Sequence, residues 1–154
     1  MKLKIKKLHP AAIIPKFATE GAACFDLHAL AVDGDFHIGS NVWATDPVLC
    51  ETGLAFEVPP GHAMLIFSRS GHGFNDDVRL ANCVGVIDSD YRGEVKVKLT
   101  CDRDVEYTTS PFHIKPGDRI AQAMIIELPH IQIEEVEELS DTARGTGGFG
   151  STGQ

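Results

Sequence analysis

Short apolar runs separated by turn residues are the feature that most limits the folds open to this chain. Charged and apolar side chains alternate through residues 94–99, which is the two-residue period of a half-buried β-strand. Turn signals such as Pro59-Pro60-Gly61 and Pro116-Gly117-Asp118 separate runs of this kind. No stretch shows a convincing amphipathic helical period. We therefore expect roughly eight to eleven short strands in an all-β domain, a jelly-roll-like barrel or sandwich.

The expected strands cover much of the chain but leave one region without a clear pattern. Residues 31–51 carry loop signals and the only tryptophan, Trp43. Residues 84–87 and the alternating run after them are expected to form a β-hairpin, because a turn-rich segment containing Gly93 separates them. The expected strands are residues 3–5, 54–58, 63–67, 84–87, 94–99, 112–114, 119–126 and 131–136.

A chain of 154 residues is long enough for one domain with its own hydrophobic core. We place that β domain at residues 1–140. Residues 141–154 are expected to form a flexible C-terminal arm, because the glycine-rich stretch 144–153 contains too few apolar side chains to build a core.

The charge and the cysteines exclude several classes of protein. A formal net charge of −8 argues against nucleic-acid binding, which requires a basic face. No apolar run is long enough to span a membrane or to serve as a secretory signal. The four cysteines are scattered and form no C-x-x-C motif, so we expect reduced thiols and a cytoplasmic protein rather than disulfides or a zinc site.

Two segments carry residue types suited to catalysis or to anion binding. In residues 85–94, Gly-Val-Ile-Asp-Ser-Asp-Tyr-Arg-Gly-Glu, Asp88 would sit at the edge of an apolar floor, where a fixed carboxylate can act as a base. The alternative is a solvated turn. In residues 68–73, Arg69 follows a strand among small residues, an arrangement that suits a phosphate, whereas His72 beside it is more typical of a solvated histidine.

Other candidates depend on partners that sequence alone does not identify. Asp26 lies in an apolar run, and a buried carboxylate needs a partner. Gln122, within an apolar strand, would bond either to backbone or to a ligand. The tail carries Arg144 and Phe149, which on a glycine tether would close over a nucleotide, one on a phosphate and one on the base; the alternative is a mobile terminus.

Taken together, five segments resemble the five ordered motifs of the trimeric dUTPases, the deoxyuridine triphosphate nucleotidohydrolases. The most specific are N-x-x-G-V-I-D-S-D-Y-R-G-E and R-G-x-G-G-F-G-S-T-G. The five segments are residues 23–27, 69–71, 82–94, 117–122 and 144–153.

This resemblance implies a jelly-roll subunit of a homotrimer, with each active site built from several subunits and closed by a C-terminal arm. It implies hydrolysis of dUTP to dUMP and pyrophosphate, with Mg²⁺ on the triphosphate. Asp88 would deprotonate the water that attacks the α-phosphorus. Tyr91 would pack on the deoxyribose and leave no space for a 2′-hydroxyl.

The remaining site residues follow from the same resemblance. The uracil would contact Asn82, Gly85, Val86, Ile87 and the main chain of Lys96. The phosphates would contact Arg69, Ser70, Gly71, Gln122 and Arg144, while Phe149 would cover the uracil beside Gly150. No direct protein ligand to Mg²⁺ is implied, and Asp26 would contact the metal only indirectly.

Several positions depart from the family pattern. Cys24 stands in place of a glycine, Ser68 and Glu51 in place of prolines, and His72-Gly73 in place of Leu-Ala. Two other functions remain open: a dCTP deaminase of the same fold, and a dUTPase-like regulatory protein that binds a partner through residues 33–52 or the acidic run 134–138.

Overall fold

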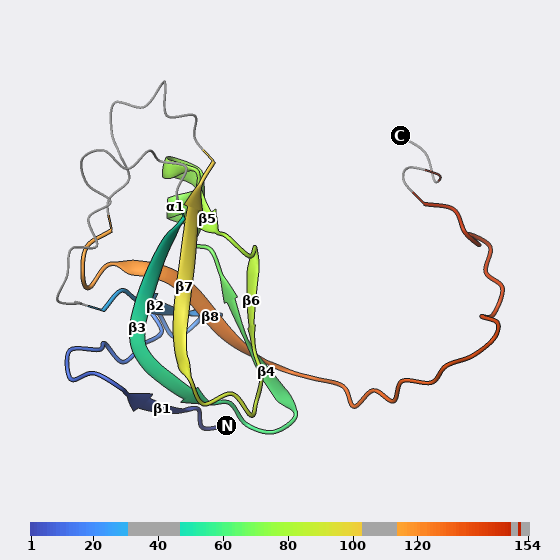
Figure 1. The fold of residues 1–154 in the computed structure, drawn as a ribbon, viewed down its shortest axis with the longest axis horizontal. Helices are drawn as coiled ribbons and strands as arrows, with labels where there is room; N and C mark the ends of the chain where they lie inside the picture. The colour runs from blue at the N-terminus through green and yellow to red at the C-terminus, as the bar shows by residue number, and fades with distance from the viewer. Residues whose placement is uncertain (31–46, 103–113, 149–150, 152–154) are drawn as a thin grey trace.

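A computed structural model of the chain describes residues 1–30, 47–102, 114–148 and 151. Two four-stranded antiparallel sheets face each other (Figure 1), so the sandwich form of the expected fold is confirmed, and the described strands do not close a barrel. The first sheet has the order β1 (Lys4–Lys7), β3 (Val48–Glu57), β7 (Glu94–Cys101), β5 (Val78–Leu80). The second has the order β2 (Phe25–His28), β8 (Arg119–Glu127), β4 (His62–Phe67), β6 (Val84–Ile87).

The core lies between the two sheets. β7 shows the expected alternation, because Val95, Val97 and Leu99 are buried while the lysines between them are exposed. A fully buried side chain of this size contributes roughly 1.5–3 kcal/mol. Thr52 is a buried polar residue of β3, and its hydroxyl donates to the Val95 carbonyl at 2.6 Å, which satisfies it inside the core.

The expected β-hairpin between β6 and β7 is wrong. β6 pairs with β4, from Met64 opposite Ile87 to Phe67 opposite Val84, whereas β7 pairs with β3 and β5 in the other sheet. Residues 88–93 therefore cross from one sheet to the other. The two-residue period identifies each strand but not its partner, because either pairing buries the same face.

Three other expectations about local structure are also corrected. β3 begins at Val48, within the stretch expected to be a loop. A short helix, α1 (Ser70–Asp76), replaces the expected turn, and it buries no residue, so it has no apolar period to reveal it. No strand forms at 131–136. Trp43 and residues 112–113 lie outside the described part of the chain.

The chain leaves the two sheets after β8 and runs away from them (Figure 1). The Leu128 amide still donates to the Gly61 carbonyl at 2.8 Å. Beyond it, Ile131 and Ile133 are 73% and 98% exposed, an unusual state for two isoleucines so close together. Within the described ranges, no helix is long and apolar enough to cross a membrane.

Candidate active site

A pocket of about 440 Å³ lies between β6 and β7. It collects five of the expected substrate-binding residues, Asn82, Gly85, Val86, Ile87 and Lys96. Among the described strands, β5 and β6 are the edges of their sheets, so no further described strand closes the two layers at the pocket. A pocket of this size with apolar walls and a few polar groups suits one flat base of a small ligand. The other lining residues are Leu49, Ile66, Leu80, Ala81, Val97 and Lys98.

Two strands approach each other closely at Gly85. A Cβ atom at Gly85 would lie 3.2 Å from the Cβ of Ile66, its partner on β4. A side chain at position 85 would need a shift of a few tenths of an ångström between β6 and β4, at the edge of the pocket.

The Lys96 side chain at the pocket is held by two carboxylates. Its Nζ lies 2.6 Å from Glu51 Oε1 and 3.5 Å from Glu94 Oε2. The hydrogen bond that Lys96 donates to Glu51 raises the pKa of Lys96 above its ordinary value. Glu51 is the cross-strand partner of Lys96, a role missed by the sequence interpretation, which treated residue 51 as loop; reading the strand from Val48 would have placed it opposite Lys96.

The crossing segment 88–93 presents Asp88 and Tyr91 next to the pocket. Asp88 is exposed, and within the described part of the chain no hydrogen bond or ion pair engages its carboxylate. A turn fixes the backbone here, because the Tyr91 amide donates to the Asp88 carbonyl at 3.2 Å. The carboxylate is therefore available to a water molecule.

Tyr91 is held in place by its own hydroxyl and by a glycine. The hydroxyl donates to the Glu94 carbonyl at 3.0 Å. A Cβ at Gly93 would lie 2.4 Å from that hydroxyl oxygen, a separation that no side chain permits. Gly93 thus lets the ring fold back over the segment, which leaves a partly exposed aromatic face beside Asp88.

A second cluster surrounds Arg69, just after β4. Arg69 Nε donates to Asp26 Oδ1 at 3.1 Å, and Arg119 Nη1 lies 3.4 Å from Asp26 Oδ2. The Asp26 side chain is only 18% exposed, so the carboxylate has the partners that burial requires. Arg69 also donates from Nη1 to the Arg119 carbonyl, and the same nitrogen lies 3.3 Å from His72 Nε2.

Gln122 belongs to this cluster through the backbone. Its Nε2 donates to the Ser68 carbonyl at 2.9 Å, so the structure provides the backbone partner that the sequence left as one of two possibilities. The Ser68 hydroxyl accepts from the Leu80 amide at 2.9 Å. A proline could accept no such bond at this position, so Ser68 links the end of β4 to β5 in a way that the family pattern does not predict. Ser70 and Gly71 follow as the first residues of α1.

One chain does not bring the Arg69 cluster and Asp88 together. Arg69 follows the end of β4 where Phe67 faces Val84, and Asp88 follows the other end of β6, where Ile87 faces Met64. Three residues of strand separate these ends, roughly 10 Å. The Arg69 guanidinium also points toward Asp26 on β2, at the opposite edge of the sheet from β6.

The arm residues lie apart from both clusters. Arg144 Nε donates to the Gly147 carbonyl at 2.7 Å within the arm, which runs away from the sheets in Figure 1. Phe149 and Gly150 lie outside the described residues. The described residues of the arm therefore complete neither cluster within a single chain.

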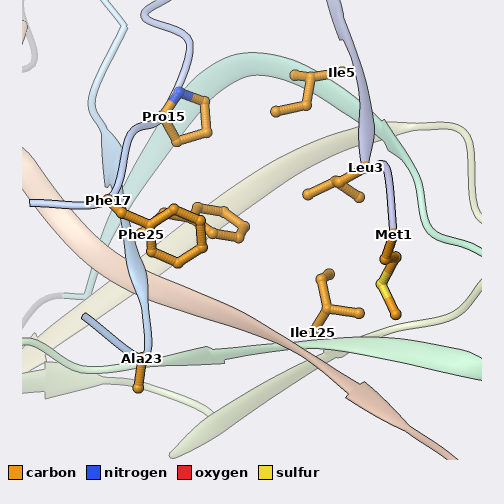
Figure 2. A pocket seen from close by; sticks show the side chains of 8 residues that line it. All are labelled: Met1, Leu3, Ile5, Pro15, Phe17, Ala23, Phe25 and Ile125. Atoms are coloured by element: carbon orange, nitrogen blue, oxygen red, sulfur yellow. The ribbon is translucent and has the colours of Figure 1, made fainter. Parts of the chain in front are cut away.

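Figure 2 shows a second pocket, of about 360 Å³, whose lining side chains are all apolar. Phe17 and Phe25 meet edge to face there, with ring centroids 5.7 Å apart. None of the expected site residues lines it, and it offers no polar side chain to a nucleotide. The lining residues are Met1, Leu3, Ile5, Pro15, Phe17, Ala23, Phe25 and Ile125.

The described residues contain no group of three or more acidic, histidine or cysteine side chains placed to hold a metal ion. Asp26, the acidic residue of the Arg69 cluster, is already paired with two arginines. A magnesium ion fits such a site when most of its ligands are phosphate oxygens and water, which is the usual arrangement for this ion.

Comparisons with known proteins agree with this geometry. The family model for dUTPases matches residues 11–153. A deoxyuridine 5′-triphosphate nucleotidohydrolase of Nautilia profundicola is 47% identical over 154 residues, the whole length of both chains. One from Helicobacter hepaticus is 44% identical over 99% of this chain and 89% of its own.

Solved structures agree on the fold. A mutant dUTPase of Staphylococcus bacteriophage 80alpha, with dUpNHpp, has a TM-score of 0.77 at 22% identity over 99% of each chain. A mutant dUTPase of phage phi11 of S. aureus, described for its coordination of a structural Mg(II) ion, has a TM-score of 0.70 at 19% identity, covering 90% of this chain and 98% of the other. With the family model and relatives that match along the whole sequence, these findings show that the chain belongs to the dUTPase family.

Proposed function

We propose that this chain hydrolyses dUTP to dUMP and pyrophosphate. Full-length relatives named deoxyuridine 5′-triphosphate nucleotidohydrolases support the activity. The structural observation that carries it is the pocket containing Asn82 and residues 85–87, followed at once by the unengaged carboxylate of Asp88. A base bound in that pocket would place its sugar and α-phosphate toward residues 88–91.

In the proposed reaction, Asp88 takes a proton from a water molecule as the water oxygen attacks the α-phosphorus. The bond between the α-phosphorus and the oxygen that it shares with the β-phosphorus breaks, and pyrophosphate leaves with the electron pair of that bond. Tyr91 would lie flat against the deoxyribose and exclude a ribonucleotide by steric overlap with its 2′-hydroxyl. Asn82 and the main chain at Gly85, Val86, Ile87 and Lys96 would bind the uracil edge.

The triphosphate would be held mainly by cations and amide donors. Arg69 and Arg144 supply charge-assisted hydrogen bonds, and Ser70 and Gly71 lie next to Arg69. Gln122 has one amide hydrogen left to donate after its bond to Ser68. Mg²⁺ on the triphosphate would neutralise phosphate charge, and Asp26 would act on it only through Arg69 or water.

The separation of the two clusters supports a homotrimer with shared active sites. Asp88 and Arg69 lie at opposite ends of the β4–β6 pair, and the Arg69 guanidinium points toward β2 at the far edge of the sheet. We therefore place the Asp88 and the Arg69 cluster of one active site on different subunits. The same proposal divides the chain into a β domain, residues 1–140, and an arm, residues 141–154, that closes an active site. Arg144, Phe149 and Gly150 would then act on a neighbouring subunit's substrate.

The exposed isoleucines of the C-terminal segment support the same assembly. In an extended segment Ile131 and Ile133 share one face, and the apolar pocket of Figure 2 offers a matching surface. The pocket lies beside β1, an edge strand with one free hydrogen-bonding side. β1 carries lysines, and the acidic run 134–138 directly follows the isoleucines. We infer that this segment of one subunit covers the pocket of the next.

Replacing both isoleucines with aspartate should dissociate the assembly. The wild-type protein should have a mass of about 50 kDa, three times the 16.7 kDa chain, by light scattering after size exclusion. The double variant should elute as a monomer, because each buried isoleucine contributes roughly 1.5–3 kcal/mol at an interface. Gln132→Asp is the matched control, because it adds a charge on the opposite face of the segment. A variant that stays trimeric would contradict this covering role.

A panel of substrates tests the function itself. With Mg²⁺ present, dUTP should yield pyrophosphate, while UTP and dCTP should be hydrolysed at least about 100-fold more slowly, a discrimination within reach of steric exclusion and a specific hydrogen-bonding edge. Ammonia from dCTP would identify the deaminase instead. No product from any of the three would favour a protein whose role is to bind a partner. No nucleic acid or membrane takes part in the proposed reaction.

A cytoplasmic location is also part of the proposal. Cys24, Cys50, Cys83 and Cys101 are all free thiols, and burial raises the pKa of Cys50 to about 11. Such a set of unpaired cysteines accords with a reducing compartment.

A further inference from the structure

The Arg69 guanidinium is held by three acceptors, one of which is a histidine. Its Nε donates to Asp26 at 3.1 Å, and its Nη1 lies 3.3 Å from His72 Nε2 and 3.4 Å from the Arg119 carbonyl. His72 follows Arg69 by three residues, a spacing that brings two side chains to one face of a helical turn.

The contact defines the protonation state of His72. Arginine has only donors, so His72 Nε2 must accept, which requires a neutral ring with its proton on Nδ1. Burial lowers the pKa of His72 below its ordinary value, and the charge on Arg69 lowers it further. Near neutral pH the ring is therefore in the state that the contact requires.

We propose that His72 is a positioning residue for Arg69: its neutral ring orients the guanidinium that binds the substrate triphosphate. This inference rests on the proposed function, in which Arg69 binds phosphate oxygens. When the ring takes up a second proton, Nε2 becomes a donor and two cations face each other, so Arg69 loses this partner. The effect falls on substrate binding, because the attacking water is prepared by Asp88 on a separate segment.

The surroundings of His72 contain charges of both signs. Asp76 of α1 and Asp118 from the turn before β8 raise the pKa of His72, while Arg119 lowers it. β5 packs against α1 and carries Arg79, whose guanidinium makes two hydrogen bonds to one carboxylate. Arg69 is in direct contact with the ring, with its Nη1 3.3 Å from His72 Nε2.

Steady-state kinetics with two variants separate positioning from simple packing. His72→Gln keeps an acceptor but cannot titrate, whereas His72→Leu removes the acceptor. At about pH 8 we expect KM for dUTP to be near the wild-type value in His72→Gln and about three- to tenfold higher in His72→Leu, with kcat little changed in both. Between about pH 8 and about pH 5.5 the KM of the wild type should rise several-fold more than that of His72→Gln.

The terminal phosphate of dUTP takes up a proton in a pH range similar to that of His72, which also changes KM. This substrate effect is the same for the wild type and for His72→Gln, so the difference between their KM profiles reports His72 alone. Equal pH profiles for the two enzymes would overturn the proposal. So would a wild-type KM that falls on acidification relative to His72→Gln, which would make protonated His72 a phosphate ligand.

A titration of His72 without substrate tests its contact with Arg69 independently of whether the protein hydrolyses dUTP. The His72 ring proton, followed by NMR in the whole protein, should titrate below its ordinary range, and Arg69→Gln should move the pKa of His72 upward by removing the neighbouring cation. An unchanged pKa of His72 in Arg69→Gln would overturn the positioning role, whether or not dUTP is hydrolysed. Absence of dUTP hydrolysis at about pH 8 with a shifted pKa would instead refute the proposed function alone.

Discussion

Asp88→Asn should lower kcat for dUTP hydrolysis by about 10²–10⁴-fold, the usual contribution of a general base. The substitution keeps the size and shape of the side chain but removes its ability to take a proton. Since the Asp88 side chain makes no hydrogen bond or ion pair within the described residues, the change breaks no side-chain contact that stabilises the fold. Pyrophosphate release measures the loss of turnover, and calorimetry with a non-hydrolysable dUTP analogue measures the affinity, which should stay within about threefold.

Asp90→Asn is the matched control for this experiment. Asp90 lies two residues further along the same crossing segment and is exposed, so it reports the effect of removing a nearby negative charge. Its kcat should stay within about tenfold of the wild type, since a single exposed charge has a small effect at this distance. Near-normal turnover by Asp88→Asn, or equal losses in both variants, would show that Asp88 is not the base.

Removal of residues 144–154 should reduce kcat/KM by about 10²–10⁴-fold. The truncation deletes Arg144, which we expect to bind a phosphate, and Phe149, which we expect to stack on the uracil. A hydrogen bond to a charged group contributes about 1.5–3 kcal/mol and a stacked base about 1–3 kcal/mol, so their combined loss has this magnitude. Among the described residues Arg144 makes hydrogen bonds only within the arm, and the melting temperature should therefore change by less than about 2 °C.

Single substitutions at Arg144 and Phe149 show how much of the lost kcat/KM each side chain accounts for. Arg144→Lys keeps the positive charge but loses the planar fork of donors, so its loss should be smaller than that of Arg144→Ala. Phe149→Leu retains an apolar side chain without a ring to stack. A truncated protein that melts well below the wild type would instead show that the arm stabilises the fold.

Most of the longer strands were predictable from the sequence because each shows its own local pattern, whereas β2, β5 and the first half of β3 were not among the expected strands. The alternation in residues 94–99 placed β7 correctly, and the apolar run 119–126 placed β8. The pairing of β6 was not predictable, because alternation reports which face is buried and not which strand lies alongside. The short helix α1 escaped prediction for a related reason, since it buries nothing and has no apolar face.

The site was predicted unevenly for similar reasons. The pocket residues Asn82, Gly85 and Ile87 follow one another in a single motif, and the structure places them together. The partners of Arg69 come from β2, from α1 and from the start of β8, far apart along the chain. No local pattern indicates that Asp26 and His72 meet one guanidinium. The pairing of Glu51 with Lys96 similarly depends on the register between β3 and β7.

Because β6 and β7 belong to different sheets, the pocket between them joins the two layers of the sandwich. A base bound there would touch both layers and would resist their sliding or spreading apart. β5 and β6, each bonded to a single neighbour, would gain support on their open side. Nucleotide binding would thus stabilise the contact between the two sheets. The amide hydrogens of β5 and β6 should then exchange with solvent more slowly in the nucleotide complex than in the free protein.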